Sequence, residues 1–236
     1  MKSIRKNEMY TTSNYLEKNP TWHTEDSIYK AKQILKIIKR NNLQPNSITD
    51  IGCGAGEVLH QLSIQMNSND ISFVGYEISP DAFELCQQIK RNGLQYKFGN
   101  FFDDNSTIYD IILAMDVVEH IEDYLGFLRD LNKYGKYKIF NFPLDMNVLD
   151  TFRNSQLRYR KQYGHIHYFS KDTVLEALQE SGCEIIDYFY VPGGNVMSCK
   201  TITSCLLKLP RILGFKINKD LTVRTFGGFS LMVLAK

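Results

Sequence analysis

The sequence predicts an α/β fold: a three-layer, doubly wound sheet of seven mostly parallel strands, with an antiparallel last strand. Three observations lead to this prediction. Short apolar runs alternate with amphipathic helical patterns as far as Val191, which is typical of a parallel sheet covered by helices. A glycine-rich turn at 52–56 joins the first strand to its helix. One further apolar run, Phe229–Ala235, supplies the seventh strand.

Length and composition narrow the possible functions. The 236 residues suit one domain, 1–236, and 43% of them are apolar, enough for a sizeable core. The formal net charge of +2 gives no strong electrostatic preference for nucleic acid or anionic lipid. We expect a small-molecule acceptor rather than nucleic acid, and a monomer or homodimer. Five scattered cysteines without a C-x-x-C pair fit a reducing cytoplasm. No apolar run is long enough for stable membrane insertion.

Periodicity and turn signals predict the remaining elements in order. Ser27–Arg40 carries apolar residues at helical spacing with lysines opposite, so it is expected to be a covering helix. The strands after the glycine turn are expected at Ile71–Glu77, Leu94–Asp103 including its loop, Tyr109–Asp116, Tyr137–Pro143 and Cys183–Val191. The helices between them are expected at 57–66, 80 to about 91, 123–132 and 171–180.

The turn at 50–57 reads Asp-Ile-Gly-Cys-Gly-Ala-Gly-Glu. Alternate glycines let the backbone approach a ligand closely, while N–H groups at the helix N-terminus stay free to donate. A dinucleotide turn would carry a glycine where Glu57 stands, and a phosphate loop would need a Lys-Ser/Thr pair. With Asp50 before the turn and Glu57 after it, the site suits a cationic, phosphate-free ligand.

This octapeptide resembles the first motif of the class I S-adenosylmethionine-dependent methyltransferases. The resemblance covers roughly residues 30 to 191 and the last strand. It implies the class I methyltransferase fold, an enzyme, and S-adenosyl-L-methionine as cofactor. The cofactor contacts that it implies in this motif are Asp50, Gly52, Cys53, Gly54 and Gly56.

Further cofactor contacts are expected at the next two strand ends. Glu77 follows the glycines by about twenty residues, the distance at which a carboxylate reaches ribose hydroxyls. The resemblance implies that Ile78 lies against the adenine. It also implies an adenine contact for Asn100, where many relatives have aspartate; an amide oxygen can accept the same bond. Phe101 is expected either to stack near the purine or to fill the core.

The fourth strand ends in Asp116, and the sequence Asp-Val-Val-Glu-His-Ile-Glu-Asp begins there. It resembles the fourth-strand motif of a large methyltransferase group that ends in Glu-His. Asp116 is therefore a further expected cofactor contact. If the chain turned helical at Asp116, Glu119 and His120 would fall on one face.

Three interpretations of this constellation remain open. In the first, Asp116 and Glu119 form a capping box and His120 merely packs beneath the cofactor. In the second, His120 is the general base that deprotonates an acceptor hydroxyl, since histidine titrates near neutral pH. In the third, Asp116, Glu119 and His120 bind a metal ion with His165 or His167, because the array resembles the magnesium or manganese site of small-RNA 2′-O-methyltransferases and quinone O-methyltransferases.

Three segments lie outside the regular alternation. Residues 1–26 are polar with aromatic residues, and are expected to be an arm docked on the core or a lid over the site. The insertion 144–169 mixes arginines and tyrosines, and contains Gly-His-Ile-His-Tyr-Phe-Ser, which resembles a pattern of small-molecule methyltransferases in which a histidine faces the site. We expect this insertion and the segment 192–226 to surround the acceptor. The alternative for 144–169 is a solvated cationic loop. The alternatives for 192–226 are a helical cover, a dimer contact or a membrane-surface element.

These patterns predict transfer of a methyl group to the oxygen of a small molecule, such as a glycan precursor or secondary metabolite. His120 or His165 would be the catalytic base. Two alternatives remain. One is a metal-assisted RNA 2′-O- or quinone/catechol-type O-methyltransferase, and the other is a cofactor-binding partner subunit without catalysis of its own.

Overall fold

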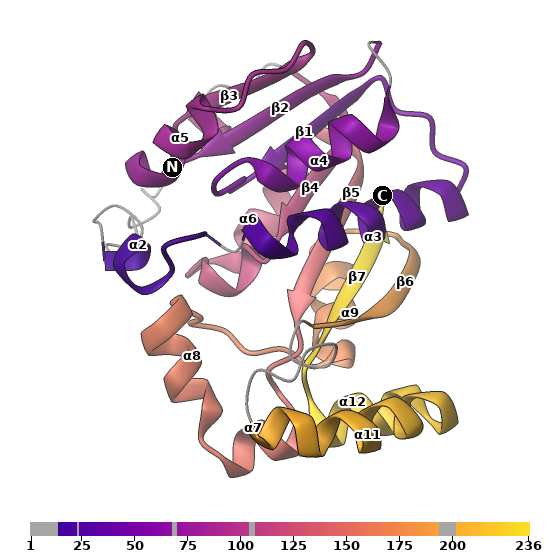
Figure 1. Ribbon diagram of the computed structural model, residues 1–236. Coiled ribbons are helices and arrows are strands. Elements are labelled where there is room, and N and C mark those ends of the chain that lie inside the picture. The colour runs from indigo at the N-terminus through magenta and orange to yellow at the C-terminus, as the bar shows by residue number, and fades with distance from the viewer. Residues whose placement is uncertain (1–13, 23, 68–69, 104–106, 194–201) are drawn as a thin grey trace.

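The computed structural model describes residues 14–22, 24–67, 70–103, 107–193 and 202–236 (Figure 1). The seven strands are β1 (Ser47–Ile51), β2 (Ser72–Glu77), β3 (Leu94–Phe98), β4 (Tyr109–Met115), β5 (Gly135–Pro143), β6 (Ile185–Pro192) and β7 (Phe229–Ala235). The helices that cover the sheet are α3 (Ser27–Arg40), α4 (Glu57–Met66), α5 (Pro80–Gln87), α6 (Tyr124–Leu131) and α9 (Lys171–Glu180).

The sheet has the order β3-β2-β1-β4-β5-β7-β6. Strands β1 to β5 pair in parallel, and β7 pairs antiparallel with β5 and β6. The predicted fold class is confirmed. Because the chain reverses its strand order beside β1, the carboxyl ends of β1 and β4 flank the crevice where ligands bind in such sheets.

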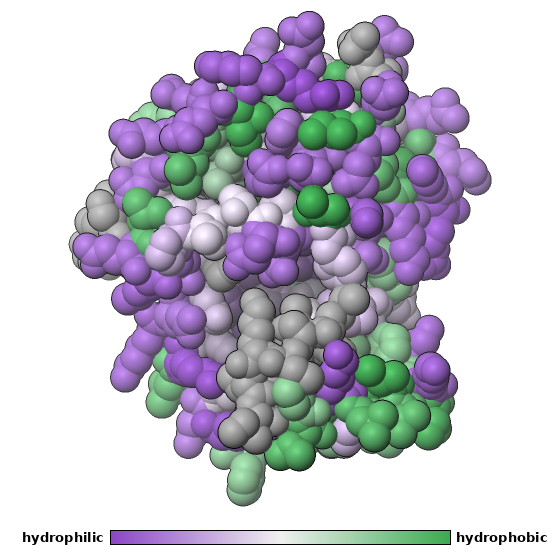
Figure 2. All heavy atoms as spheres, viewed as in Figure 1, coloured by the Kyte–Doolittle hydropathy of each residue, from purple (hydrophilic) through white to green (hydrophobic). Residues whose placement is uncertain are grey.

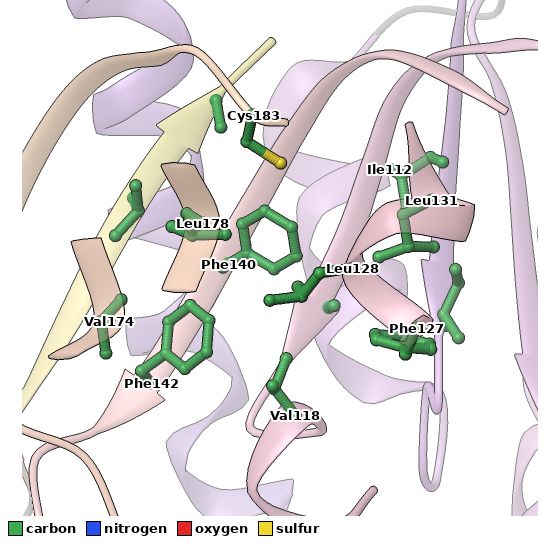
Figure 3. Packing of buried hydrophobic residues seen from close by; sticks show 14 of the residues in the cluster. Ile112, Val118, Phe127, Leu128, Leu131, Phe140, Phe142, Val174, Leu178 and Cys183 are labelled. Atoms are coloured by element: carbon green, nitrogen blue, oxygen red, sulfur yellow. The ribbon is translucent and has the colours of Figure 1, made fainter. Parts of the chain in front are cut away.

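Two hydrophobic clusters hold helices to opposite faces of the sheet. On one face, α3 and α4 pack over residues such as Ile48, Ile111 and Leu113. On the other, α6 and α9 pack over Ile112 and Phe140, as Figure 3 shows. Neighbouring residues of β4 therefore enter different clusters, which is why this strand reads as a continuous apolar run.

The local signals explain where most helices begin and end. The bounds of α3 and α4 agree with those predicted. Ala31, Ile34, Ile37 and Ile38 of α3 are buried, whereas Leu35 is half-buried and Ile28 is 51% exposed. The Ser79 hydroxyl accepts from the Ala82 amide at 3.5 Å at the start of α5. A capping box between Ser170 and Thr173 starts α9. Strand β5 begins two residues earlier than the sequence suggests, at Gly135.

The insertion 144–169 and the segment 192–226, the two irregular segments, contain helices that form one lobe. The first segment contains α7 (Val148–Phe152) and α8 (Ser155–Tyr163), and the second contains α11 (Ile202–Ile217) and α12 (Lys219–Phe226). Helix α12 contacts α11 and α7, and α7 contacts α8. We call residues 148–163 and 202–226 the outer lobe; it lies beyond the carboxyl ends of the parallel strands (Figure 1). Within the described residues, every helix is too short or too polar to cross a bilayer.

Candidate active site

The glycine turn that follows β1 has a left-handed backbone conformation at its three glycines. Gly52, Gly54 and Gly56 have φ of 68°, 58° and 79°, a region in which side chains with a Cβ are strained. A Cβ at Gly56 would also lie 2.6 Å from the ring of Tyr96, whose hydroxyl donates to the Gly56 carbonyl at 2.6 Å. The Gly52 amide donates to the Tyr76 carbonyl at 2.8 Å, which fixes the turn to β2.

Glu77 connects β2 to this turn. Its carboxylate accepts from the Gly54 amide at 2.8 Å and from the Ser79 amide at 2.7 Å. Burial raises the pKa of Glu77 to about 7, against these backbone hydrogen bonds. Asp50 is also buried, and burial together with the charge of Glu77 raises its pKa to about 8. Among the described residues Asp50 Oδ1 is buried and has no hydrogen-bond partner.

The other predicted cofactor contacts differ in what they offer a ligand. Ile78 is 39% exposed beside Glu77, and Asn100 lines a cavity of about 480 Å³ at the end of β3, although its amide oxygen accepts from the Phe102 amide at 3.2 Å. The side chain of Cys53 points into the protein, 4.0 Å from the Cys86 sulfur, so only its backbone is available to a ligand.

Phe101 is a core residue. It is 2% exposed, and its ring makes edge contacts with Tyr76 and Tyr134. The expected stacking of Phe101 on a purine needs a free ring face, which this position does not provide. Of the two roles predicted for it, the structure therefore supports the apolar core residue.

Asp116 stands at the end of β4 with φ of 58°, so the chain does not turn helical there. Its carboxylate binds the Lys30 ammonium at 2.7 Å and the Asn141 amide at 2.6 Å. Burial alone would raise the pKa of Asp116, but Lys30 and Asn141 hold it below its usual value. The predicted capping box of Asp116 and Glu119 is wrong, because α6 begins later and is capped by Asp123, whose carboxylate accepts from Gly126.

Glu119, His120 and His165 offer ligand atoms that all lie within 4.8 Å of one another. Glu119 is fully buried, and neither of its carboxylate oxygens has a hydrogen-bond partner among the described residues. Burial, and then the charge of Asp116, raises its pKa well above the usual value. Burial, and then His165, lowers the pKa of His120 to about 4, so this ring is neutral at physiological pH. A buried carboxyl beside two imidazoles is a suitable metal ligand set.

The backbone brings the two histidine segments together. The Glu119 carbonyl accepts from the Ile166 and His167 amides, which fixes the 164–169 loop against the end of β4. His165 Nδ1 lies 2.6 Å from Asp145 Oδ2, and His120 Nδ1 lies 3.2 Å from the Gly164 carbonyl oxygen. Of the two later histidines proposed as ligands, the structure brings His165 to the cluster.

His167 lies elsewhere. Its Nε2 is 2.9 Å from the Ile121 carbonyl oxygen, and its ring packs on Tyr124. Three residues that the sequence did not single out surround the cluster instead: Lys30, Asn141 and Asp145. Asn141 and Asp145 were recognisable only as polar residues near the end of a buried strand, a position where ligands collect.

These groups line a cavity of about 300 Å³, the site cavity. Asp116, Glu119, His120 and His165 form one part of its wall, and Tyr15, Tyr29, Tyr159, Tyr163, Phe229 and Met232 give it apolar surface. Both irregular segments therefore border the cavity, the first (144–169) through Tyr159 and Tyr163 of α8 and the second (192–226) through Pro192 and Gly193.

The N-terminal segment bridges the two sides of the site. The short helix α2 (Asn14–Lys18) contacts α8, where Lys18 Nζ donates to the Lys161 carbonyl at 3.0 Å and the Asn19 amide to the Gln162 carbonyl at 3.3 Å. Trp22, whose ring is 4.6 Å from that of Tyr15, lies over the glycine turn: a Cβ on Gly54 would be 3.7 Å from it.

The strand order, the glycine turn and the carboxylate at the end of β2 define a class I methyltransferase. A methyltransferase-domain family model matches residues 23–188. The chain belongs to this methyltransferase family, and its cofactor is S-adenosylmethionine.

Comparison with individual proteins agrees with this family assignment. A ubiquinone biosynthesis O-methyltransferase of Rickettsia bellii (strain OSU 85-389) is 26% identical over 172 residues, 67% of this chain and 67% of that protein. Its counterpart in Rickettsia conorii (strain ATCC VR-613 / Malish 7) is 26% identical over 121 residues, 50% of this chain and 39% of that protein. The chain thus spans between about two fifths and two thirds of the length of these relatives.

A solved structure shows the same fold at lower identity. The magnesium protoporphyrin IX methyltransferase from Synechocystis PCC 6803, crystallised with bound SAH, superposes with a TM-score of 0.63 at 12% identity. The alignment covers 97% of this chain and 96% of that one.

Proposed function

We propose that the chain transfers the methyl group of S-adenosylmethionine to a hydroxyl oxygen of a small molecule held in the site cavity. The observation that carries this proposal is the cluster of Glu119, His120 and His165 in the cavity wall. An alcohol or phenol must lose its proton when it attacks the methyl carbon, and this cluster is equipped to assist that loss. The names of the Rickettsia relatives, O-methyltransferases, support oxygen as the acceptor atom.

The cofactor would lie across the ends of β1 and β2. Glu77 would accept from the ribose hydroxyls, Ile78 would contact the adenine and Asn100 its amino group. The buried carboxyl of Asp50 would lie towards the cationic end of the cofactor. Because the methyl group starts on a positive sulfur, attack disperses charge, so most of the rate enhancement comes from positioning the acceptor about 3–3.5 Å from the methyl carbon.

His165 is the side chain best placed to take the acceptor proton. With Nδ1 donating to Asp145, the lone pair on Nε2 is left to accept. The Asp145 carboxylate also stabilises the imidazolium that results. The ring of His120 is neutral at physiological pH, and its Nε2 lies 3.8 Å from the Glu119 carboxylate.

The same residues fit a divalent metal ion, and this is the second candidate mechanism. Glu119 supports it because a carboxyl with two unpartnered oxygens is costly to bury without a cation. Glu119, His120 and His165 would hold the ion, while Asp116 is occupied by Lys30 and Asn141. When bound, the ion would lower the pKa of an acceptor hydroxyl. Asp145 would then orient His165 as a ligand.

One experiment tests the function and separates the two mechanisms. The protein is incubated with methyl-labelled S-adenosylmethionine and a panel of small phenols, catechols, amines and thiols, with and without chelator. Label on oxygen supports the proposal, and label only on nitrogen or sulfur contradicts it. Loss of transfer with chelator, restored by Mg²⁺ or Mn²⁺, supports the metal-assisted mechanism; unchanged transfer supports His165 acting as base alone.

A partner subunit without catalysis would bind S-adenosylhomocysteine yet label nothing in that panel.

The remaining assignments extend the same proposal. The N-terminal segment 1–26, of which 1–13 and 23 lie outside the described residues, would act as a lid; the contacts of Lys18 and Asn19 with α8 and the position of Trp22 over the glycine turn support this role. The segments 144–169 and 192–226 would shape the acceptor site. Four free cysteines among the described residues support a cytoplasmic protein, and we propose a monomer or homodimer that does not act on nucleic acid.

A further inference from the structure

The outward face of α11 is apolar. Four side chains follow one another along it at helical spacing: Leu206, Leu209, Leu213 and Ile217. Each is between 51% and 86% exposed. The opposite side of the helix carries Arg211, which is 7% exposed and donates to the Phe226 carbonyl at 2.7 Å. A helix that covers a core has the reverse arrangement, with leucines inward and arginine outward.

Exposed apolar residues continue on the other helices of the outer lobe. Those with more than 60% of their surface exposed are Val148 and Phe152 on α7, Leu157 on α8 and Leu221 on α12. Figure 2 shows hydrophobic residues gathered at the lower right, where Figure 1 places α11 and α12. A concentration of exposed apolar side chains on this scale indicates a contact with something outside the chain.

The charge of the outer lobe indicates what that contact is. Its two segments, 148–163 and 202–226, contain nine lysines and arginines and two aspartates, a formal net charge of +7 in a chain whose total is +2. Lys216 lies in the last turn of α11 and Lys219 begins α12; both are exposed, and the Lys219 ammonium lies 5.7 Å from the centre of the Phe215 ring. Exposed leucines flanked by cations are the arrangement of helices that lie in the interface of an anionic membrane.

We propose that the outer lobe binds the surface of an anionic lipid bilayer, with the apolar face of α11 inserted among the acyl chains and Lys216 and Lys219 at the phosphates. A second copy of the chain is a poor occupant, because two faces of the same strong positive charge repel each other. Nucleic acid would match the charge but not the leucines. The binding is peripheral, and it does not depend on the reaction that the site cavity carries out.

Co-sedimentation of the full chain with vesicles tests the proposal. The vesicles are phosphatidylcholine alone, or phosphatidylcholine with about 30% phosphatidylglycerol, an anionic lipid. We expect binding to the anionic vesicles that weakens at least about tenfold as NaCl rises from about 0.05 to 0.5 M, because salt screens the lysines. Equal binding to both vesicle types, or no binding to either, overturns the proposal without any variant being made.

Matched variants locate the surface. Leu209→Ser removes a side chain that is 63% exposed on α11, and Ile108→Ser removes one that is 65% exposed before β4, away from the lobe. We expect Leu209→Ser to weaken binding about tenfold and Ile108→Ser to leave it unchanged. The double variant Lys216→Glu and Lys219→Glu should abolish the preference for anionic vesicles. Equal effects of the two serine variants, or a dimer that dissociates with Leu209→Ser while vesicle binding is unaffected, contradict the proposal.

Discussion

The cofactor side and the acceptor side of this site are built in different ways. At the ends of β1 and β2, the backbone amides of Gly54 and Ser79 hold Glu77, and each element follows the previous one along the chain. At the ends of β4 and β5, side chains hold one another across long separations, as Lys30 holds Asp116 and Asp145 holds His165. A turn that binds through its backbone needs a local sequence, whereas an acceptor site can change side chain by side chain. This difference explains how one fold can combine a common cofactor with many acceptors.

The largest effect is expected from His165→Ala, which removes the proposed base or metal ligand. The turnover number should fall about 10²–10⁴-fold, while the affinity for S-adenosylhomocysteine, measured by calorimetry, should stay within about twofold because the cofactor side is separate. A variant that binds the cofactor and retains full turnover would show that His165 takes no part in the chemistry.

Glu77→Gln should act on the other side. The loss of a charged acceptor for the ribose hydroxyls should weaken cofactor binding about 10–100-fold, since a hydrogen bond to a charged group contributes about 1.5–3 kcal/mol. Glu84→Gln, at an exposed position of α5, is the control and should bind normally. If both variants bind alike, the ribose assignment is wrong.

Asp145→Asn tests positioning within the acceptor side. The amide keeps the size of the carboxylate but loses its charge, so His165 is held less well in the required tautomer. Turnover should fall about 10–100-fold with cofactor affinity unchanged, and Asp145→Glu should recover part of the loss. A fall in cofactor affinity instead of turnover would indicate a structural role only.

Cofactor binding should strengthen with pH. In the cofactor-free protein Glu77 has a pKa of about 7 and Asp50 of about 8. Below these pKa values each carboxyl holds a proton, and a bound cationic ligand favours the loss of that proton. The affinity for the cofactor should therefore rise about tenfold from pH 6.5 to 8.5 and then level off. Calorimetry in two buffers of different ionisation enthalpy measures the released protons. Asp50→Asn should reduce this dependence.

The smallest effect concerns stability. Burial raises the pKa of Glu119 in the folded protein. As the pH rises, Glu119 therefore loses its proton in the unfolded chain, where its pKa is about 4.3, before it does so in the folded protein. Between these two pKa values the free energy of unfolding falls as the pH rises. Glu119→Gln should therefore raise the melting temperature of chelator-treated protein by about 2–4 °C at pH 8, and by less at pH 5. If Mg²⁺ or Mn²⁺ stabilises the original protein and not the variant, Glu119 is a ligand.

The sequence predicted the fold correctly because the fold depends on local patterns, and the expected cofactor contacts, which stay predictions, rest on local patterns too. Alternation of strands and helices, three glycines and an acid twenty residues later are all visible without knowing contacts. The acceptor side was predicted only in part. His120 and His165 were recognised as candidates, but the pairing of Asp116 with Lys30 depends on contacts between distant segments, and Phe101 could be assigned to the core only once Tyr76 and Tyr134 were placed around it.

The position of β7 has a consequence for biosynthesis. This strand comes last along the chain yet lies between β5 and β6 in the sheet. On the ribosome, β1 to β5 can pair and bury their helices while residues 229–235 are still in the exit tunnel, but β6 has no partner until those residues emerge. A nascent chain stalled before Phe229 would thus expose the edge of β5, and recruitment of chaperones to that intermediate should end once β7 has paired with β5 and β6.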